Sequence, residues 1–199
     1  MKKTSMGGSG VINLDRLYEE KSVFGFFANQ LSYPEKQTFH PLVLEESIDS
    51  SDPSYPHVKK YWELMHAYSL EEIQEMYINI FDFQKDATLF MTFVKYEDSK
   101  ERGQMLARLK VLYEMFGLVM PDNELSDFLP LMCEFIYAAD WKGDPRAQQS
   151  FSMLLAVLED GSYHLMKALE KYESPYFHLI KGMREVFKSC IQQEVPANE

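Results

Sequence analysis

Apolar residues recur along this chain at the spacing of an α-helix rather than that of a β-strand. The clearest stripe follows Ser69 and consists of Ile73, Met76, Tyr77, Ile80 and Phe81. This i, i+3, i+4, i+7, i+8 pattern places all five side chains on one helical face. Ser69 and Glu72 have the spacing of a capping box, so the pattern predicts an amphipathic helix that begins after Ser69.

Comparable stripes predict helices along the rest of the chain. They run over residues 14–31, 39–47, 58–67, 106–116, 128–136, 151–158, 165–169 and 179–191. Residues 83–96 are ambiguous, because Leu89–Val94 has a strand-like composition but no evident pairing partner, and we predict a helix there. With no internal repeat and no convincing strand pair, we predict an all-α bundle of about eight or nine helices.

Glycine, proline and short polar residues mark the expected helix ends. Gly117, with Pro121 behind it, predicts the end of one helix, and a later helix is expected to end near Gly161. Pro130 is tolerated in the first turn of its helix. The predicted N-terminal caps are Asp98, Ser126 or Asp127, Asp144 and Ser174.

The length and composition fit one domain with short tails. The chain has 199 residues, of which 46% are hydrophobic and 14% aromatic, enough to fill a sizeable core. We predict a domain over residues 11–193, with flexible segments at 1–10 and 194–199. No apolar run reaches the ~20 residues of a membrane span, and residues 1–10 lack the apolar region of a secretory signal.

The two cysteines, Cys133 and Cys190, lie among apolar residues at helical spacing. This placement predicts reduced core thiols and fits a cytoplasmic protein, with a disulfide between them as the less favoured alternative.

Acidic residues outnumber basic ones by 31 to 20, which gives a net charge of −11. This charge argues against nucleic acid or an anionic membrane as a partner. Two stretches, 61–84 and 111–141, contain acids but no lysine or arginine. If they face each other, they form an apolar floor with an acidic rim that suits a helix carrying cations. The pattern alone favours the plainer alternative, in which both stripes are core and the acids are ordinary surface.

Motifs that carry catalysis or bind a metal are weak in this sequence. Glu63 and His66 have the Glu-x-x-His spacing of helical metal sites, but no other histidine of the chain repeats it. Neither cysteine has an adjacent base, and neither a nucleophile elbow nor a phosphate-binding loop occurs. We therefore predict no catalytic and no metal-binding residues.

Three segments resemble the NarJ-type nitrate reductase assembly chaperones, whose wider family includes the TorD and DmsD types. Residues 75–83 (EMYINIFDF) are similar to the family's Tyr-x-x-x-Phe-Asp segment, and residues 99–104 (SKERGQ) to its Ser-Arg-Asp/Glu-Arg-Gly-Gln segment. Residues 124–135 look like its Glu-Leu-Pro-Asp-His-Leu-Pro…Glu-Phe signature. The resemblance covers roughly residues 23–139.

The resemblance implies a cytoplasmic, all-helical chaperone that is not an enzyme. Its client would be the N-terminal segment of the nitrate reductase alpha subunit, a twin-arginine signal or its relic. The chaperone would hold this subunit until molybdopterin guanine dinucleotide is inserted, and so delay membrane docking, without stably binding a cofactor or inserting into the membrane itself. It would be a monomer or a domain-swapped dimer, with the 48–57 loop as a candidate hinge.

Two other functions stay open. The first is the same mechanism with another molybdoenzyme client, of the dimethyl sulfoxide or trimethylamine oxide reductase type. The second is a helical enzyme or nucleotide hydrolase with an unrecognised site.

The family's site residues carry over onto this sequence with one clear departure. Its Asp-His pair falls on Asp127 and Phe128, so the acid is kept and the imidazole is lost. Asp127 is expected to meet a cation of the client peptide. The aromatic segment from Tyr77 to Phe81 is expected to contact its apolar face, although core packing is as good an interpretation of these residues. The expected client-binding residues are Tyr77, Ile80, Phe81, Asp82, Glu124, Asp127, Phe128 and Glu134.

Overall fold

The computed structural model describes residues 12–191, and all the regular elements within this range are helical. The α-helices are α1 (Leu14–Glu19), α2 (Ser22–Leu31), α3 (Leu42–Ser47), α4 (Tyr55–Met65), α5 (Leu70–Tyr77), α6 (Phe93–Tyr96), α7 (Lys100–Met115), α8 (Leu129–Ala138), α9 (Ala147–Lys171) and α10 (Tyr176–Ser189). A π-helical segment, η1 (Ile78–Asp82), and a 3₁₀ turn, η2 (Lys85–Ala87), follow α5. The predicted all-α bundle is confirmed. The segments predicted to be flexible, 1–10 and 194–199, lie outside the described residues.

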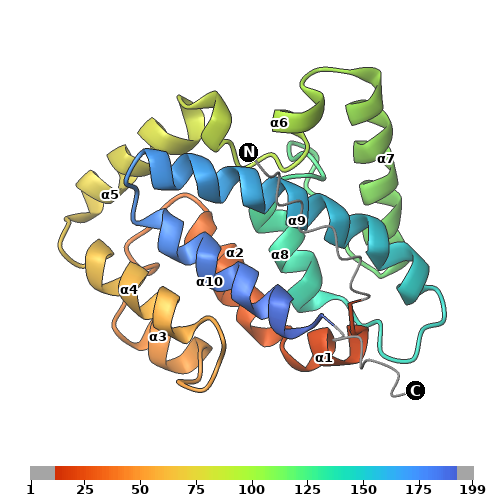
Figure 1. Cartoon of the computed structure of the whole chain (residues 1–199), viewed down its shortest axis with the longest axis horizontal. Coiled ribbons are helices and arrows are strands. Elements are labelled where there is room, and N and C mark those ends of the chain that lie inside the picture. Colours follow the sequence, from red (N-terminus) through yellow and green to blue (C-terminus); the bar gives the residue numbers. More distant parts are fainter. Residues whose placement is uncertain (1–11, 192–199) are drawn as a thin grey trace, which may run out of the picture.

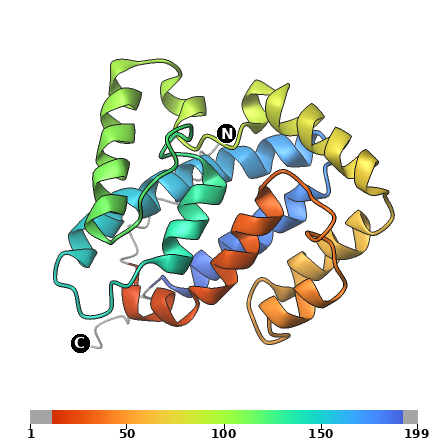
Figure 2. The ribbon, with the colours of Figure 1, turned by 180° about the vertical axis from the view of Figure 1, so that it is seen from behind.

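Three helix pairs form the centre of the bundle. Helix α2 packs along α8, and α10 packs against both α4 and α9 (Figures 1 and 2). The interior between these helices is rich in aromatic rings, each of which removes a large apolar area from water. The largest fully buried aromatic side chains are Tyr61, Tyr113, Tyr176, Phe24, Phe27, Phe135 and Phe151.

The two stretches without basic residues do not face each other as a pair of helices. Helices α5 and α7 lie at opposite ends of the molecule (Figure 1). The apolar stripe of α8 is buried, and this helix packs on α2. The interpretation of these stripes as core, which the pattern alone favours, is therefore confirmed, and α5 and α7 do not form the alternative floor between two facing stripes.

Several local predictions from the sequence are confirmed. The capping box before α5 is present, since Ser69 N donates to Glu72 Oε2 at 2.8 Å and Glu72 N donates to Ser69 Oγ at 3.3 Å. Gly117 adopts a positive φ of 87° just beyond α7, as expected for a residue that ends a helix. Pro130 lies in the first turn of α8.

The first predicted helix, over residues 14–31, is in fact two helices. The helix is interrupted at Glu20 and Lys21, which lie between α1 and α2. Lys21 Nζ donates to Ala139 O at 2.8 Å and lies 4.4 Å from the centre of the Tyr18 ring. The break thus joins the start of the bundle to the end of α8, a long-range contact that the local pattern does not reveal.

The helix predicted over residues 83–96 is largely wrong. Residues 88–92 are non-helical, and Phe90 forms an antiparallel β-bridge with Phe128. Met91 N donates to Asp127 O at 2.9 Å, and Leu129 N donates to Leu89 O at 2.9 Å. The strand-like composition of this segment therefore correctly indicated extended backbone. Its bridge partner, Phe128, lies far along the chain.

Gly161 does not end a helix, because α9 continues through it to Lys171. A Cβ atom on Gly161 would lie only 2.6 Å from Met91 O. The glycine is needed for the close approach of the 88–92 segment to α9, and one long helix replaces the two that were predicted there.

Most of the predicted caps have other roles. Ser99 rather than Asp98 caps α7 by accepting from Arg102 N, and α8 follows Phe128 without a side-chain cap. Ser126 Oγ instead donates to Leu106 O at 2.7 Å. Asp144 accepts from Arg146 N in the turn before α9, and Pro175 rather than Ser174 directly precedes α10.

Both cysteines are buried and unbonded to each other, as predicted. Burial raises the pKa of the Cys133 thiol well above its usual value. Within residues 12–191, no helix is long and apolar enough to cross a membrane, and no group of three or more potential metal ligands gathers. His66 Nδ1 instead lies 2.9 Å from Trp62 O in its own helix.

Candidate functional site

Tyr77 and Phe81, at the junction of α5 and η1, belong mainly to the core. Each is only 6% exposed. The Tyr77 hydroxyl donates to Leu31 O at 3.0 Å, and its ring lies 4.8 Å from that of Phe81. Phe81 in turn packs edge-on against Tyr176 at 4.9 Å. Ile80 is half-buried against the same core. These residues form a rigid support in the structure, and any direct contact with a ligand stays a prediction.

The residues that follow Phe81 turn outward. Asp82 is exposed at the end of η1, and Phe83 just after it is 71% exposed. Tyr33, which is 47% exposed, packs edge-on against the Tyr77 ring at 5.6 Å. A π-helical turn accommodates an extra residue relative to an α-helix, and such turns are frequent at functional sites.

Glu124 reaches the same region from the connector between α7 and α8. The pKa of Tyr77 is raised first by burial and then by the negative charges of Asp82 and Glu124. Both carboxylates therefore lie within electrostatic range of the Tyr77 hydroxyl. Leu125 follows Glu124 and is 42% exposed. We call Tyr33, Asp82, Phe83, Glu124 and Leu125 the open face.

Sequence reasoning identified the two acids of the open face but missed its three apolar members. Tyr33, Phe83 and Leu125 are ordinary apolar residues in the sequence, and nothing in their spacing separates them from core residues. The only available signal was that Phe83 and Leu125 each directly follow a candidate acid.

Asp127 lies three residues beyond Glu124 but is completely buried. Its Oδ2 accepts from Arg102 Nη2 at 3.2 Å and from Thr92 N at 3.2 Å. The Thr92 hydroxyl also donates to Asp127 and accepts from Arg102 Nε at 3.1 Å. We call Thr92, Arg102 and Asp127 the enclosed cluster.

This geometry changes the interpretation of Asp127. Its carboxylate meets a cation of its own chain, and a peptide cation could reach it only by displacing Arg102. Asp127 is therefore not an exposed carboxylate, and the expected contact with a client cation stays a prediction. Since Arg102 lies on α7 and Thr92 just before α6, the cluster ties both segments to the connector that carries Glu124.

The last two candidates lie apart from the open face. Phe128 is half-buried, and its ring lies 5.5 Å from that of Phe90 in the β-bridge. Glu134 is exposed on α8, and no described hydrogen bond or ion pair connects it with the other candidates. The structure thus brings together Tyr77, Phe81, Asp82 and Glu124, but not the whole predicted set.

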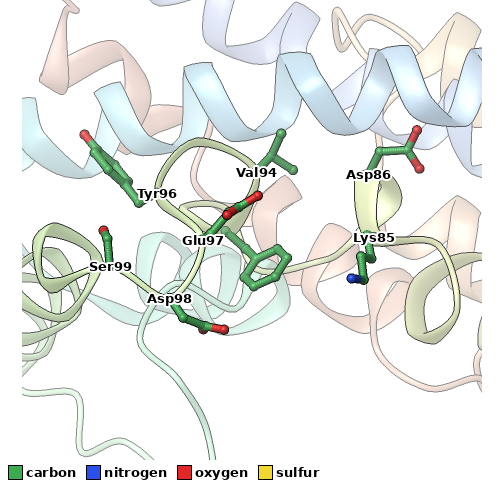
Figure 3. A pocket seen from close by; sticks show the side chains of 8 residues that line it. Lys85, Asp86, Val94, Tyr96, Glu97, Asp98 and Ser99 are labelled. Atoms are coloured by element: carbon green, nitrogen blue, oxygen red, sulfur yellow. The ribbon is translucent and has the colours of Figure 1, made fainter.

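A hollow of about 590 Å³ is lined by residues between Lys85 and Ser99. None of the predicted client-binding residues lines it. Figure 3 shows Lys85 and Asp86 on one side of it, with the turn from Tyr96 to Ser99 on the other. The pKa of Asp86 is lowered first by the hydrogen bond from Tyr172, just beyond α9, and then by Lys171, the last residue of α9. Its charge is thus already balanced by the chain.

The open face combines carboxylates with exposed apolar side chains, a combination that is typical of protein-binding surfaces. The fold and this face therefore favour the class of binding proteins.

Comparisons with known proteins identify which kind. The chain is 32% identical to the probable nitrate reductase molybdenum cofactor assembly chaperone NarJ of Bacillus subtilis (strain 168) over 141 residues, which are 66% of this chain and 73% of that protein. It is 24% identical to the nitrate reductase molybdenum cofactor assembly chaperone NarJ of Escherichia coli (strain K12) over 128 residues, or 64% of this chain and 51% of that protein. A further match, 27% over 107 residues, is to the nitrate reductase-like protein NarX of Mycobacterium tuberculosis (strain ATCC 25618 / H37Rv), covering 54% of this chain and 15% of that protein.

No family model matches the chain. The similarity to the Bacillus protein nevertheless places it: the chain belongs to the family of nitrate reductase molybdenum cofactor assembly chaperones. It is a chaperone and not an enzyme, as the resemblance implied.

Proposed function

We propose that this chain binds the N-terminal segment of the alpha subunit of respiratory nitrate reductase in the cytoplasm. It holds that subunit until its molybdenum cofactor has been inserted, and so delays membrane docking. The names of the relatives from Bacillus and Escherichia, which are nitrate reductase assembly chaperones, support this choice of client.

The observation that carries the proposal is the composition of the open face. Its three apolar side chains are 42–71% exposed: Phe83 and Leu125 each follow an exposed acid in the chain, and Tyr33 packs against the buried Tyr77 ring. Exposed apolar residues of this kind are typical of interaction sites when they gather beside polar ones. A client segment that folds into an amphipathic helix would place its apolar residues on Phe83 and Leu125 and its cations near Asp82 and Glu124.

The enclosed cluster supports this face without touching the client. Its hydrogen bonds fix residue 127, and so restrict the connector on which Glu124 and Leu125 lie. Because a disordered segment loses entropy when it folds on binding, a partner surface that is already ordered gives tighter binding. Asp127 is thus proposed as a residue that orders the site.

The proposed chaperone binds no cofactor stably, and molybdopterin guanine dinucleotide goes to the client. It acts as a monomer, with domain exchange at residues 48–57 as the route to a dimer. In the structure, this segment is irregular over residues 48–54 and joins α3 to α4.

Co-purification from cells that are making nitrate reductase tests the proposal. The tagged chain should recover the alpha subunit, and deletion of the N-terminal segment of that subunit should abolish the recovery. Peptides from the N-termini of dimethyl sulfoxide and trimethylamine oxide reductases serve as competitors. If one of these binds and the nitrate reductase peptide does not, the proposed client is wrong.

A further inference from the structure

The hollow lined by residues between Lys85 and Ser99 adjoins the open face. Phe83 of the open face lies two residues before Lys85, so their Cα atoms are at most about 8 Å apart. The helical turns on either side of Phe83, η1 and η2, pack against each other. A peptide that covers Phe83 can therefore reach the hollow with its next two or three residues, because an extended residue spans about 3.3 Å.

Apolar side chains form one wall of the hollow. Phe93 and Tyr96 are half-buried there, and Val94 is 39% exposed. Both rings already attract cations of the chain: the guanidinium carbon of Arg102 lies 5.3 Å from the centre of the Phe93 ring, and Lys95 Nζ lies 5.5 Å from that of Tyr96. Such a wall suits a side chain that has an apolar stem and a positively charged head.

Two acids in the turn between α6 and α7, Glu97 and Asp98, lie at the edge of this wall. Both are exposed, and the side chain of Asp98 is 90% accessible to solvent. Asp98 forms an ion pair with Arg102 at 3.7 Å, but Arg102 lies closer to the buried Asp127, at 3.2 Å. The charge of Arg102 is therefore largely balanced by Asp127, and the turn keeps most of its negative charge.

Other charged residues around the hollow are balanced by partners in the chain, with Lys85 as the main exception. Asp86 is paired with Lys171 at 3.0 Å, and Lys95 with Asp160 at 3.2 Å. Lys85 is exposed and lies across the hollow from the acidic turn (Figure 3). Two acids thus stand against one base, which leaves room for one further positive charge.

The backbone at Glu97 supports a role for its side chain. Glu97 has a positive φ of 46°, a conformation that glycine adopts without strain and that other residues rarely adopt. A glutamate at this position therefore lowers the stability of the fold. Strain of this kind is concentrated at binding sites, where the side chain contributes to function.

We propose that the hollow receives one basic side chain of the client segment, which packs against Phe93 and Tyr96 and pairs with Glu97 and Asp98. This inference rests on the proposed function and adds a second contact region to it. Arginine suits the hollow better than lysine, because its planar guanidinium can stack on a ring while it donates to two carboxylates. Lys85 opposes the incoming charge and so limits the hollow to a single cation.

Calorimetry with two peptides tests the pairing. The first is the N-terminal peptide of the alpha subunit, and the second has its lysines and arginines replaced by glutamine. Glu97→Gln/Asp98→Asn should weaken binding of the first peptide by about fivefold, because two exposed charge contacts are lost. The same variant should leave binding of the glutamine peptide unchanged, since that peptide has no cation to lose. The control Glu45→Gln/Glu46→Gln, on α3, should bind both peptides as the parent chain does.

Lys85 provides a variant with the opposite sign. Lys85→Gln should strengthen binding of the first peptide by about two- to threefold, because the repulsion of its cation is removed. Lys110→Gln removes the same charge from an exposed position of α7 and should have no effect. General damage to the fold would not improve binding, so an increase in affinity separates the proposed contact from a structural role.

The outcomes distinguish this proposal from the proposed function. If the parent chain binds neither peptide, the proposed function is wrong and the proposal for the hollow is wrong with it. If Asp82→Asn/Glu124→Gln weakens binding but Glu97→Gln/Asp98→Asn does not, only the hollow is excluded from the site. Equal weakening for both peptides would also overturn the proposal, because the effect would then involve no client cation.

Discussion

Glu124 and Asp127 are three residues apart in one acidic connector, yet the fold gives them opposite environments. Glu124 is exposed on the open face, whereas Asp127 has no exposed surface and is bound to Arg102 and Thr92. Only the first can offer its charge to a partner without rearrangement. An acid in a recognisable motif thus serves either recognition or internal order, and burial decides between them.

The enclosed cluster gives the largest expected effect. Asp127→Ala should lower the free energy of unfolding by about 3–5 kcal/mol, because it leaves the buried Arg102 with only a longer ion pair, at 3.7 Å, to the exposed Asp98. Urea unfolding measures this loss. The double variant Asp127→Leu/Arg102→Met removes both charges and should lose less stability than Asp127→Ala. Unchanged stability of Asp127→Ala together with lost peptide binding would reverse the comparison and make Asp127 the direct contact.

The packing of Met91 against α9 gives the next largest effect. Gly161→Ala should destabilise the protein by about 1–3 kcal/mol, since the new methyl group would overlap Met91 O, and the clash would disturb the segment that pairs with residue 127. Gly103→Ala is the matched control, because Gly103 lies in α7 with no atom near its Cβ position. This control should be stabilising by about 0.5–1 kcal/mol. Equal stability of the two variants would contradict the close approach seen at Gly161.

The open face should respond in binding rather than in stability. Asp82→Asn/Glu124→Gln should weaken binding of the alpha-subunit peptide by roughly five- to thirtyfold, as expected for two exposed charge contacts of about 0.5–1 kcal/mol each. Its unfolding free energy should change by less than about 0.5 kcal/mol. Glu45→Gln/Glu46→Gln removes the same charge from exposed positions of α3 and should bind normally. Isothermal titration calorimetry at low and high salt compares the three proteins, and equal affinities would remove the acids from the site.

The smallest expected effect concerns Glu97, in the turn before α7. It has a positive φ of 46°, which is strained for a residue with a side chain. Glu97→Gly should therefore raise the free energy of unfolding by up to about 1 kcal/mol, while the loss of its carboxylate should lower peptide affinity by about two- to threefold. Thermal unfolding measures the change in stability, and a peptide titration measures the affinity. A clear loss of stability would contradict the prediction, because it would show that the Glu97 side chain stabilises the fold by more than its backbone strain destabilises it.

The fold class was accessible from the sequence because helical periodicity and caps such as Ser69 are local. The non-helical segment near Phe90, the merging of two helices at Gly161 and the burial of Asp127 were not. Each depends on a contact with a residue distant in the chain, and a local sequence pattern cannot predict such a contact. The site was accessible to a similar extent, since the acids of the open face follow a motif but the exposure of Phe83 follows only from the fold.

Site-specific photo-crosslinking tests the central claim, that the client segment binds at the open face. Benzoyl-phenylalanine in place of Phe83 should capture the N-terminal peptide of the alpha subunit in high yield. The same probe in place of Tyr163, which is 46% exposed on α9, should give little product. Equal capture at both positions, or capture at Tyr163 alone, would contradict the account.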